Sequence, residues 1–330
     1  MTNIKDIFKA NERIKKEVIN TPLLSSDRLN EILPFNLFLK AESLQRIGAF
    51  KFRGACNAVF IVKDTKKNVI AYSSGNHAQA VALAAKIASL NATIIMPNDA
   101  PKIKIEGTKS YNPKIIFYDR YTESREKIGK KIAYEKNLEL IKPYDDTRVI
   151  AGQGTAGLEI VEQMRTINKE IDAYICCCGG GGLMAGTSIA ISHFHKNCNF
   201  FTAEPLLFND TAISLKTGKL HVNNPNSRSI CDAIVTPTPG KITFPILQKF
   251  NTNGFVATDE EVLHAMHLAW KYFKVVLEPG GAVALATAVN NKNFPSFLKR
   301  KKRNNVVIMA SGGNCDNKIF IKALETKLIL

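Results

Sequence analysis

The sequence lacks any uninterrupted apolar run close to the roughly 18 residues that a transmembrane helix needs. Residues 1–13 carry charges throughout and have no apolar core of the kind found in a secretory signal. Repeats of fixed period and low-complexity linkers are also missing. These absences argue against a membrane-bound or secreted protein, and we expect a cytoplasmic protein with no membrane partner.

A cysteine framework is missing too, although the chain contains seven cysteines. Four are isolated and three are consecutive, at Cys176, Cys177 and Cys178. Neighbouring residues of a strand point to opposite faces, so this run cannot hold one metal ion or form ordinary local disulfides. We expect buried thiols in a reducing compartment.

Acidic residues are scarce relative to basic ones: 29 Asp and Glu against 45 Lys and Arg give a net charge of +16. Such an excess raises nucleic acid, a membrane surface or an anionic small molecule as a partner. The basic run at residues 299–303 has only Phe294 and Phe297 near it as aromatic residues, and no nucleic-acid-binding motif. We therefore expect a solvated connection there and no nucleic-acid partner, and we keep a basic nucleic-acid binder as an alternative.

What is present is typical of a globular chain, with 45% apolar and 22% charged residues. A length of 330 residues suggests about two domains of ~150 residues each. Predicted strands and helices alternate, which indicates βαβ units, mostly parallel sheets and an α/β fold with two lobes. The predicted strands are 68–74, 92–97, 114–119, 173–178, 199–203 and 305–310. The predicted helices are 77–89, 122–136, 156–164, 183–195 and 260–273. A long loop is expected at residues 223–243 and is typical of a functional segment.

Three glycine-containing loops stand where a predicted strand ends and a helix begins, at residues 73–77, 179–183 and 311–314. A helix N-terminus offers unpaired N–H groups and a positive dipole, so each loop is a candidate anion site. Four glycines in a row, Gly179, Gly180, Gly181 and Gly182, let the backbone approach a phosphate closely. The simpler alternative is that all three loops are tight turns.

The second loop also matches a dinucleotide fingerprint. Gly180, Gly182 and Ala185 satisfy G-x-G-x-x-G/A, and Glu204 ends the next strand where the fingerprint places its acidic residue. A nicotinamide-dependent oxidoreductase is therefore an alternative. It leaves the other two glycine loops and the region around Lys51 unexplained.

Lys51 lies among Phe50, Phe52 and small residues. An apolar setting lowers the pKa of a lysine and leaves its amine nucleophilic. Alternatively, Lys51 and Arg53 are exposed helix charges.

Four segments taken together resemble the signatures of fold-type-II pyridoxal-phosphate enzymes, in the branch of serine/threonine dehydratases and serine racemases. Order and spacing match over nearly the whole chain. The segments are Phe50-Lys51-Phe52-Arg53-Gly54-Ala55, residues 73–80 (Ser-Ser-Gly-Asn-His-Ala-Gln-Ala), Gly179–Gly182 and Ser311-Gly312-Gly313-Asn314, with further matches at 151–155 and 278–282. The resemblance implies a tryptophan-synthase-β-like fold, with residues 1–67 and 144–330 as the large cofactor-binding domain and residues 68–143 as the small domain.

The resemblance also implies roles for single residues. Lys51, next to Phe50, would hold pyridoxal 5′-phosphate covalently and then act as the base at the substrate Cα. Backbone N–H groups of Gly179–Gly182 and Leu183 would bind the phosphate, and Asn76 would bind the pyridine 3′-oxygen. Ser311 would face the pyridine nitrogen, where a neutral hydroxyl stabilises the pyridinium less than a carboxylate would and so favours β-elimination.

The substrate carboxylate would be positioned by Ser73, Asn76 and His77, so His77 need not be a general base. Ser74 matches the hydroxyl that faces Cα opposite the lysine in racemases, but dehydratases also carry serine there. Tyr144 aligns where animal-type racemases have asparagine, and this difference favours a dehydratase. Arg125 aligns with a possible substrate-carboxylate arginine, but its place in a charged helix favours a solvated side chain.

We therefore expect an L-threonine/L-serine ammonia-lyase that forms 2-oxobutanoate or pyruvate and ammonia. A serine racemase and a 3-hydroxyaspartate dehydratase are the alternatives within the family. The family's metal site would use the Glu204 and Asp210 carboxylates and the Phe208 carbonyl, and hard oxygen ligands suit Mg²⁺ or Ca²⁺. Two surface carboxylates in a loop are the simpler alternative. We also expect a homodimer and, because the chain ends soon after Ser311, no regulatory domain.

Overall fold

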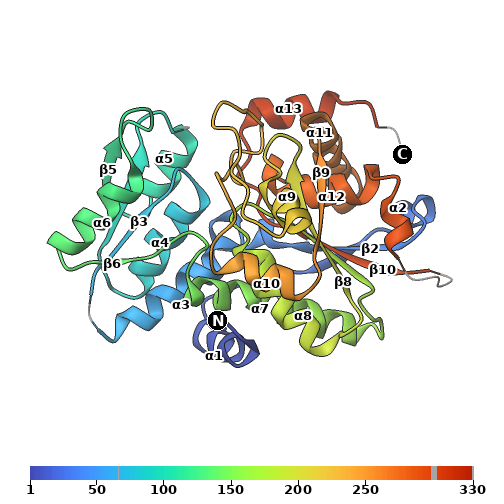
Figure 1. Ribbon diagram of the computed structural model, residues 1–330, viewed down its shortest axis with the longest axis horizontal. Coiled ribbons are helices and arrows are strands. Elements are labelled where there is room, and N and C mark those ends of the chain that lie inside the picture. Colours follow the sequence, from blue (N-terminus) through green and yellow to red (C-terminus); the bar gives the residue numbers. More distant parts are fainter. Residues whose placement is uncertain (66, 101, 299–302, 329–330) are drawn as a thin grey trace.

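The computed structural model describes residues 1–65, 67–100, 102–298 and 303–328, which form two sheets with helices packed around them (Figure 1). The larger sheet has the strand order β1 (Leu23–Ser25), β2 (Asn36–Ala41), β10 (Asn305–Ala310), β7 (Ala173–Cys177), β8 (Asn199–Pro205) and β9 (Asn253–Ala257). The smaller sheet has the order β5 (Lys114–Tyr118), β4 (Ala92–Pro97), β3 (Val69–Tyr72) and β6 (Glu139–Leu140). Only β1 pairs antiparallel; every other pairing in these sheets is parallel, as the alternating pattern predicts.

Helices cover both sheets and account for most of the remaining described chain. In chain order they are α1 (Ile4–Ile14), α2 (Asp27–Ile32), α3 (Lys51–Lys63), α4 (Asn76–Ile87), α5 (Lys102–Lys109), α6 (Arg125–Glu135), α7 (Thr147–Thr166), α8 (Gly182–Phe194), α9 (Asp210–Thr217), α10 (Thr243–Lys249), α11 (Asp259–Leu268), α12 (Pro279–Asn290) and α13 (Asn317–Glu325). Shorter helical segments are η1 (Glu42–Leu44), η2 (Arg46–Gly48), η3 (Ala269–Phe273) and η4 (Phe294–Phe297). None of the described helices is long and apolar enough to cross a membrane.

The predicted elements are present, and their ends differ for identifiable reasons. The strands predicted at 92–97 and 305–310 match β4 and β10. The helix predicted at 122–136 begins at Arg125, because the Ser124 side chain accepts a hydrogen bond from the Lys127 amide and caps it. The helix predicted at 260–273 leaves the α-helical form at Ala269 and continues as the π-helical turn η3. The predicted long loop is confirmed, because no helix or strand occurs between Thr217 and Thr243.

Strand β7, which precedes the four-glycine loop, is buried along its whole length. Its sequence is therefore continuously apolar rather than alternating, as expected of a central parallel strand covered on both faces. All seven cysteines are free thiols, and six of them are buried. The expectation of buried thiols without disulfides is confirmed for those six, and Cys315 is partly exposed.

Helix α3 lies between the two sheets and packs against α4 on one side and α7 on the other (Figure 1). The close contact with α7 explains why residues 151–155 (Ala-Gly-Gln-Gly-Thr), one of the segments that match the family signatures, contain glycine at position 152. A Cβ atom on Gly152 would lie 2.6 Å from the carbonyl oxygen of Arg53, so only glycine fits. This contact fixes the helix that begins with Lys51.

Arg53 is buried and is not the exposed helix charge considered as an alternative. Its guanidinium donates hydrogen bonds of 2.8 and 2.7 Å to the two carboxylate oxygens of Glu42, and of 2.7 and 2.8 Å to those of Glu159. Lys40, also buried, donates to Glu159 at 2.6 Å. Paired charges of opposite sign thus tie α3 to β2, η1 and α7.

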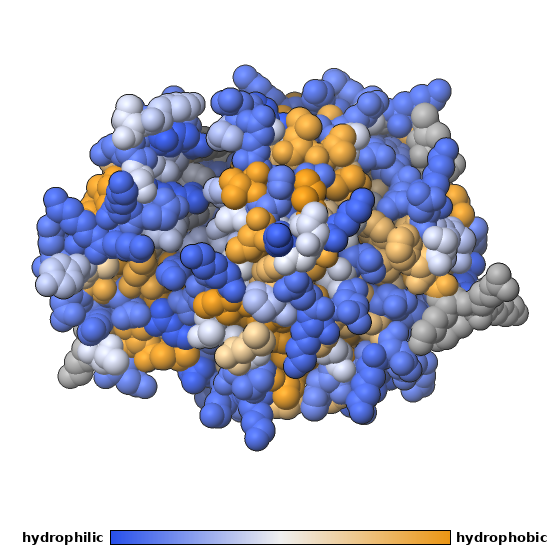
Figure 2. Space-filling model, viewed as in Figure 1, coloured by the Kyte–Doolittle hydropathy of each residue, from blue (hydrophilic) through white to orange (hydrophobic). Residues whose placement is uncertain are grey.

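Strand membership follows the expected division of the chain, since all strands of the smaller sheet come from residues 69–140. The domain limits at residues 67 and 143 stay a prediction. The surface is mostly hydrophilic on the face shown in Figure 2, and it is hollowed between the part that carries the smaller sheet and the rest. The pocket described next is lined by residues from both parts.

Candidate active site

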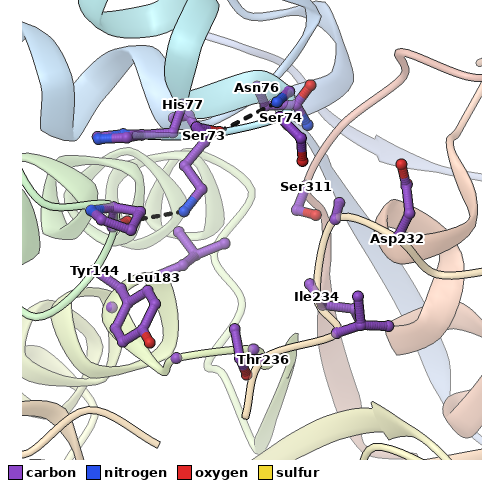
Figure 3. Close-up of a pocket in the computed structure, with 18 of the residues that line it drawn as sticks. Ser73, Ser74, Asn76, His77, Tyr144, Leu183, Asp232, Ile234, Thr236 and Ser311 are labelled. Carbon is purple, nitrogen blue, oxygen red and sulfur yellow. Dashed lines mark hydrogen bonds between the residues drawn. The ribbon is translucent and has the colours of Figure 1, made fainter. Parts of the chain in front are cut away.

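All three glycine-containing loops meet in one pocket. The loops follow β3, β7 and β10, at the carboxyl ends of parallel strands, where ligands bind in α/β proteins. Figure 3 shows side chains from five parts of the chain that line the same space: Ser73, Ser74, Asn76 and His77; Tyr144; Leu183; Asp232, Ile234 and Thr236; and Ser311. The alternative that these loops are only tight turns does not explain why all three meet in one pocket.

Lys51 lines this pocket at the first position of α3. Its Nζ donates a hydrogen bond of 2.8 Å to the carbonyl oxygen of Pro143 and lies 5.1 Å from the centre of the Phe50 ring. Burial lowers the pKa of Lys51 to about 8, although the charges of Cys177 and Glu278 oppose the shift. A neutral, nucleophilic amine is therefore accessible near neutral pH, as the apolar setting in the sequence predicts.

The backbone ties Lys51 to the third glycine loop. The Phe50 amide donates a hydrogen bond of 3.0 Å to the carbonyl oxygen of Ser311, and Ala49 forms an antiparallel bridge with Gly312. Ser311 itself is buried and lines the pocket. Two segments far apart in the sequence are thus held side by side.

The four-glycine loop connects β7 to α8 and has no room for side chains. A Cβ atom on Gly180 would lie 2.2 Å from the ring of Tyr144, and Gly181 has φ of +86°. The carbonyl oxygen of Gly180 accepts a hydrogen bond of 2.7 Å from the Thr243 hydroxyl, which fixes the loop. Together with Leu183, the loop offers backbone N–H groups at the start of a 13-residue helix, and this cradle fits a phosphate group.

Asn76 begins α4 on the opposite side of the pocket, and both ends of its amide are bound. Its Nδ2 donates a hydrogen bond of 2.6 Å to Glu278 Oε1, and its Oδ1 accepts one of 2.8 Å from Asn314 Nδ2. The second Glu278 carboxylate oxygen is buried and has no hydrogen-bond partner among the described residues. Burial raises the pKa of Glu278 to about 7.

His77 is buried next to Asn76, and its Nε2 lies 3.0 Å from the carbonyl oxygen of Ile141. A carbonyl only accepts, so Nε2 carries the proton and Nδ1 is the free acceptor. Burial, reinforced by the positive charge of Lys51, lowers the pKa of His77 to about 3. His77 is therefore neutral at physiological pH.

The other two residues of the loop, Ser73 and Ser74, differ in how they are held. Ser73 Oγ accepts a hydrogen bond of 3.2 Å from the Gly75 amide, which shapes the turn before α4. The Ser74 hydroxyl lines the pocket and makes no hydrogen bond to any described residue.

Sequence reasoning missed several residues of the pocket. Glu278 lay in a matched motif without a role, and Asp232 lay in the long loop that the sequence marks as functional. Lys104, on α5, pairs with Asp232, and nothing in its local sequence indicates this contact. Cys177, interpreted as buried strand filling, also lines the pocket.

Arg125 lines the pocket too, rather than being fully solvated. Its Nε donates a hydrogen bond of 2.8 Å to Glu126, and its guanidinium lies 5.5 Å from the centre of the Tyr72 ring. The side chain is 33% exposed, so it is partly solvated and also faces the pocket.

Glu204 and Asp210 are buried outside the pocket residues, so the surface-loop alternative is wrong for both carboxylates. Both oxygens of Glu204 accept backbone hydrogen bonds at the start of α9, from Thr211 at 2.9 Å and from Ala212 at 2.7 Å. Asp210 accepts a hydrogen bond of 2.5 Å from Asn223 through one oxygen, and its other oxygen has no partner among the described residues.

Desolvation and the neighbouring Asp210 charge raise the pKa of Glu204, and desolvation raises that of Asp210 to about 7. A cation would relieve the cost of two ionised carboxylates placed so close together. The oxygen donors, including the Phe208 carbonyl at the turn between them, are of the type that Mg²⁺ and Ca²⁺ prefer. The described residues hold no group of three or more His, Cys, Asp or Glu side chains placed to bind a metal ion together.

A family model described as pyridoxal-phosphate dependent enzyme matches residues 14–312. The chain belongs to this family. Its cofactor is therefore pyridoxal phosphate, and the glycine cradle and the low-pKa lysine fit that group. Membership in this family excludes the alternative of a nicotinamide-dependent oxidoreductase. Glu204, which that alternative assigned to a dinucleotide fingerprint, instead accepts hydrogen bonds from backbone amides of α9.

Two curated relatives and two solved structures show the similarity in detail. The chain is 42% identical to the L-threo-3-hydroxyaspartate ammonia-lyase of Saccharomyces cerevisiae, over 98% of this chain and 96% of the relative. It is 40% identical to the serine racemase of Schizosaccharomyces pombe, over 94% of each chain. Maize serine racemase superposes with a TM-score of 0.90 at 34% identity, over 98% and 97% of the two chains. The threonine deaminase of T.th. superposes with a TM-score of 0.88 at 34% identity, over 95% and 99%.

The pyridoxal-phosphate fold-type-II assignment is thus confirmed, and the protein is an enzyme of a lyase and racemase family.

The basic run at 299–302 lies outside the described residues. Arg303, which follows it, donates hydrogen bonds to the carbonyl oxygens of Asn30, Leu33 and Phe35 and serves a tertiary contact.

Proposed function

We propose that the protein is a pyridoxal-phosphate-dependent ammonia-lyase that acts on L-amino acids with a hydroxyl group at the β-carbon. The observation that carries this proposal is the Lys51 amine, with its lowered pKa, facing the same pocket as the four-glycine loop and Ser311. Pyridoxal phosphate supplies an electron sink for the bonds at the substrate Cα. Loss of the Cα proton and the β-hydroxyl as water gives an enamine, and water then hydrolyses its imine form to a 2-oxo acid and ammonia.

The chain's own groups each have a place in this proposal. N–H groups of Gly179–Gly182 and Leu183 bind the phosphate, Asn76 binds the 3′-oxygen and Ser311 faces the ring nitrogen. Lys51, neutral and next to Phe50, binds the cofactor and then accepts the Cα proton. Ser73, Asn76 and the neutral His77 position the substrate carboxylate.

L-Threonine and L-serine were the substrates that the sequence favoured, but the two curated relatives described above are named for L-threo-3-hydroxyaspartate and for serine. We therefore place L-threo-3-hydroxyaspartate and L-serine ahead of L-threonine. For 3-hydroxyaspartate the product is oxaloacetate, and for serine it is pyruvate.

Serine racemisation is the second candidate, and the Ser74 hydroxyl favours it. Ser74 makes no hydrogen bond to a described residue and lines the same pocket as Lys51, so it is free to carry a proton to or from Cα. We also propose that Glu204, Asp210 and the Phe208 carbonyl bind Mg²⁺ or Ca²⁺, supported by the unpartnered Asp210 oxygen.

The test is a pair of lysine variants on one helix. Lys51→Ala should abolish the visible absorption band of protein-bound cofactor and the release of 2-oxo acid. Lys63→Ala is the matched control, because Lys63 ends the same helix and also lies near a phenylalanine ring, 5.7 Å from that of Phe60, but does not line the pocket. Release of 2-oxo acid is measured from L-threo-3-hydroxyaspartate, L-serine, D-serine and L-threonine, together with D-serine formation. An unchanged absorption band in Lys51→Ala, or no 2-oxo acid from any of the four, contradicts the proposal.

A further inference from the structure

An ion pair between two distant segments lies at the pocket and has no role in the proposal so far. Lys104 belongs to α5, which packs against α4 beside the smaller sheet, and its Nζ donates to the carboxylate of Asp232. Asp232 lies in the long loop between α9 and α10 and appears on the right of Figure 3. Both residues line the pocket that holds Lys51.

The two partners are exposed to very different degrees. The Lys104 side chain is 9% exposed, whereas that of Asp232 is 50% exposed. Burying an ammonium is costly unless an anion compensates it, so Lys104 needs a carboxylate where it lies. Asp232, which water can reach, can leave this contact at a small cost.

Lys104 also lies directly over the loop that would hold the substrate carboxylate. A Cβ atom on Gly75 would be 3.3 Å from Lys104 Cδ and 3.6 Å from Lys104 Nζ. Gly75 stands between Ser74 and Asn76, so an amino acid bound to this loop has the Lys104 ammonium beside it. The positive charge of Lys104 also partly opposes the burial that raises the pKa of Glu278, another residue of the pocket lining.

We propose that Lys104 binds the second carboxylate of a dicarboxylic 3-hydroxy amino acid, and that Asp232 holds the same position until such a substrate displaces it. The proposal rests on the ammonia-lyase function proposed above and specifies its substrate class. Lys104 thus determines substrate specificity. In the absence of substrate, the carboxylate of Asp232 occupies the place of the substrate's second carboxylate.

Arg125 is the other unassigned side-chain cation of the pocket, but its contacts differ. It is bound by Glu126, the next residue of its own helix, and lies against Tyr72. No side chain from across the pocket pairs with it among the described residues. Of these two cations, only Lys104 pairs with a carboxylate from the opposite side of the pocket. A carboxylate of the substrate is expected to pair with Lys104 in the same way.

The decisive quantity is the ratio of kcat/KM for L-threo-3-hydroxyaspartate to kcat/KM for L-serine, measured with the holoenzyme. Lys104→Met should lower this ratio by about 10- to 100-fold, since a hydrogen-bonded ion pair with the substrate is lost. Asp232→Asn should raise the ratio, because the competing carboxylate is neutral. A ratio that stays within about twofold of wild type in both variants overturns the proposal, even where both rates fall together.

The matched control is Arg120→Met. Arg120 pairs with Asp99 beside the smaller sheet, at 2.8 Å and with exposures of 42% and 40%, and does not line the pocket. The variant removes one positive charge from the same part of the molecule, so its ratio should stay at the wild-type value. A fall equal to that of Lys104→Met would assign the effect to net charge and overturn the proposal.

A binding measurement separates this proposal from the one on which it rests. Succinate carries two carboxylates and no reacting groups, and propionate carries one. Succinate should bind the wild-type holoenzyme more tightly than Lys104→Met by about tenfold or more, while propionate should bind both equally, in calorimetry or thermal shift. If no 3-hydroxy amino acid yields a 2-oxo acid, the ammonia-lyase function is wrong, and succinate binding still decides the role of Lys104. Equal succinate affinity in both proteins overturns it.

Discussion

Glu278 accepts a hydrogen bond of 2.6 Å from the Asn76 amide, 202 residues earlier in the sequence. Asn314 completes the contact from a third segment, donating to the Asn76 oxygen at 2.8 Å and to the carbonyl oxygen of Ile47 at 2.7 Å. The side chain expected to touch the cofactor is therefore oriented before any ligand binds. Such prior orientation reduces the entropy lost on binding.

Glu278 also influences the pKa of Lys51, and this gives the first prediction. Burial lowers the pKa of Lys51 to about 8, and the negative charges of Cys177 and Glu278 partly oppose this shift. The neutral amine is the reactive form, so covalent capture of pyridoxal phosphate by the apoprotein should accelerate as pH rises through about 8. Glu278→Gln removes the charge and should move the midpoint to lower pH, measured by stopped-flow absorbance.

Glu12→Gln is the control for that measurement, because Glu12 is exposed, pairs with Lys15 and does not line the pocket. It should leave the midpoint where wild type has it. A midpoint that moves upward in Glu278→Gln, or stays at the same pH, contradicts the assigned interaction.

The second prediction concerns the buried carboxylates near α9. The pKa of Asp210 is raised from 3.8 to about 7, so the folded state binds a proton in this range that the unfolded state does not. Without divalent cations, the free energy of unfolding should therefore fall as pH rises from about 4 to about 7. Asp210→Asn should flatten this slope, measured by urea unfolding after chelation.

Adding Mg²⁺ or Ca²⁺ at about pH 8, where Asp210 is ionised, should stabilise the wild-type protein, by about 2.7 kcal/mol at roughly a hundred times the dissociation constant. Asp210→Asn should lose this gain. Equal stabilisation of the two proteins would show that the ion binds elsewhere.

The third prediction concerns the charge network that holds α3. Arg53→Met would leave the Glu42 carboxylate buried without its guanidinium partner, and such a loss costs about 3–5 kcal/mol of folding free energy. Chemical unfolding of the full chain measures it. Arg165→Met is the control, because Arg165 and Glu162 are exposed side chains one turn apart on α7, and it should cause no measurable change. If the two variants are equally stable, the network does not support α3.

Local sequence was enough to locate several elements and the glycine-containing loops of the pocket. Strands β4 and β10 could be predicted to the residue, because each is a short run of apolar and β-branched side chains bounded by turn residues. The four-glycine loop was recognisable because a run of glycines permits the positive φ of Gly181, which other residues rarely adopt. These properties depend on a few consecutive residues.

Long-range charge pairing could not be predicted in the same way. The charge on Arg53 gives no local sign of burial, and its partners Glu42 and Glu159 lie 11 and 106 residues away. Arg125 sits in a charged helix and was interpreted as solvated, yet that helix presents it to the pocket. Periodicity reports which face of a helix is apolar, but not which charged residue is enclosed by another element.

The sequence by itself determined the family, the alternation of strands and helices, and the lysine and glycine loops that we propose as the pyridoxal-phosphate site. Each of these depends on residue type at fixed spacing along one segment. Only the tertiary structure decided that Glu278 orients Asn76, that His77 is neutral, and that Lys104 meets Asp232 over Gly75. Hydrogen bonds, desolvation and charge pairing depend on distance in space, and residues far apart in the sequence acquire that proximity only through folding.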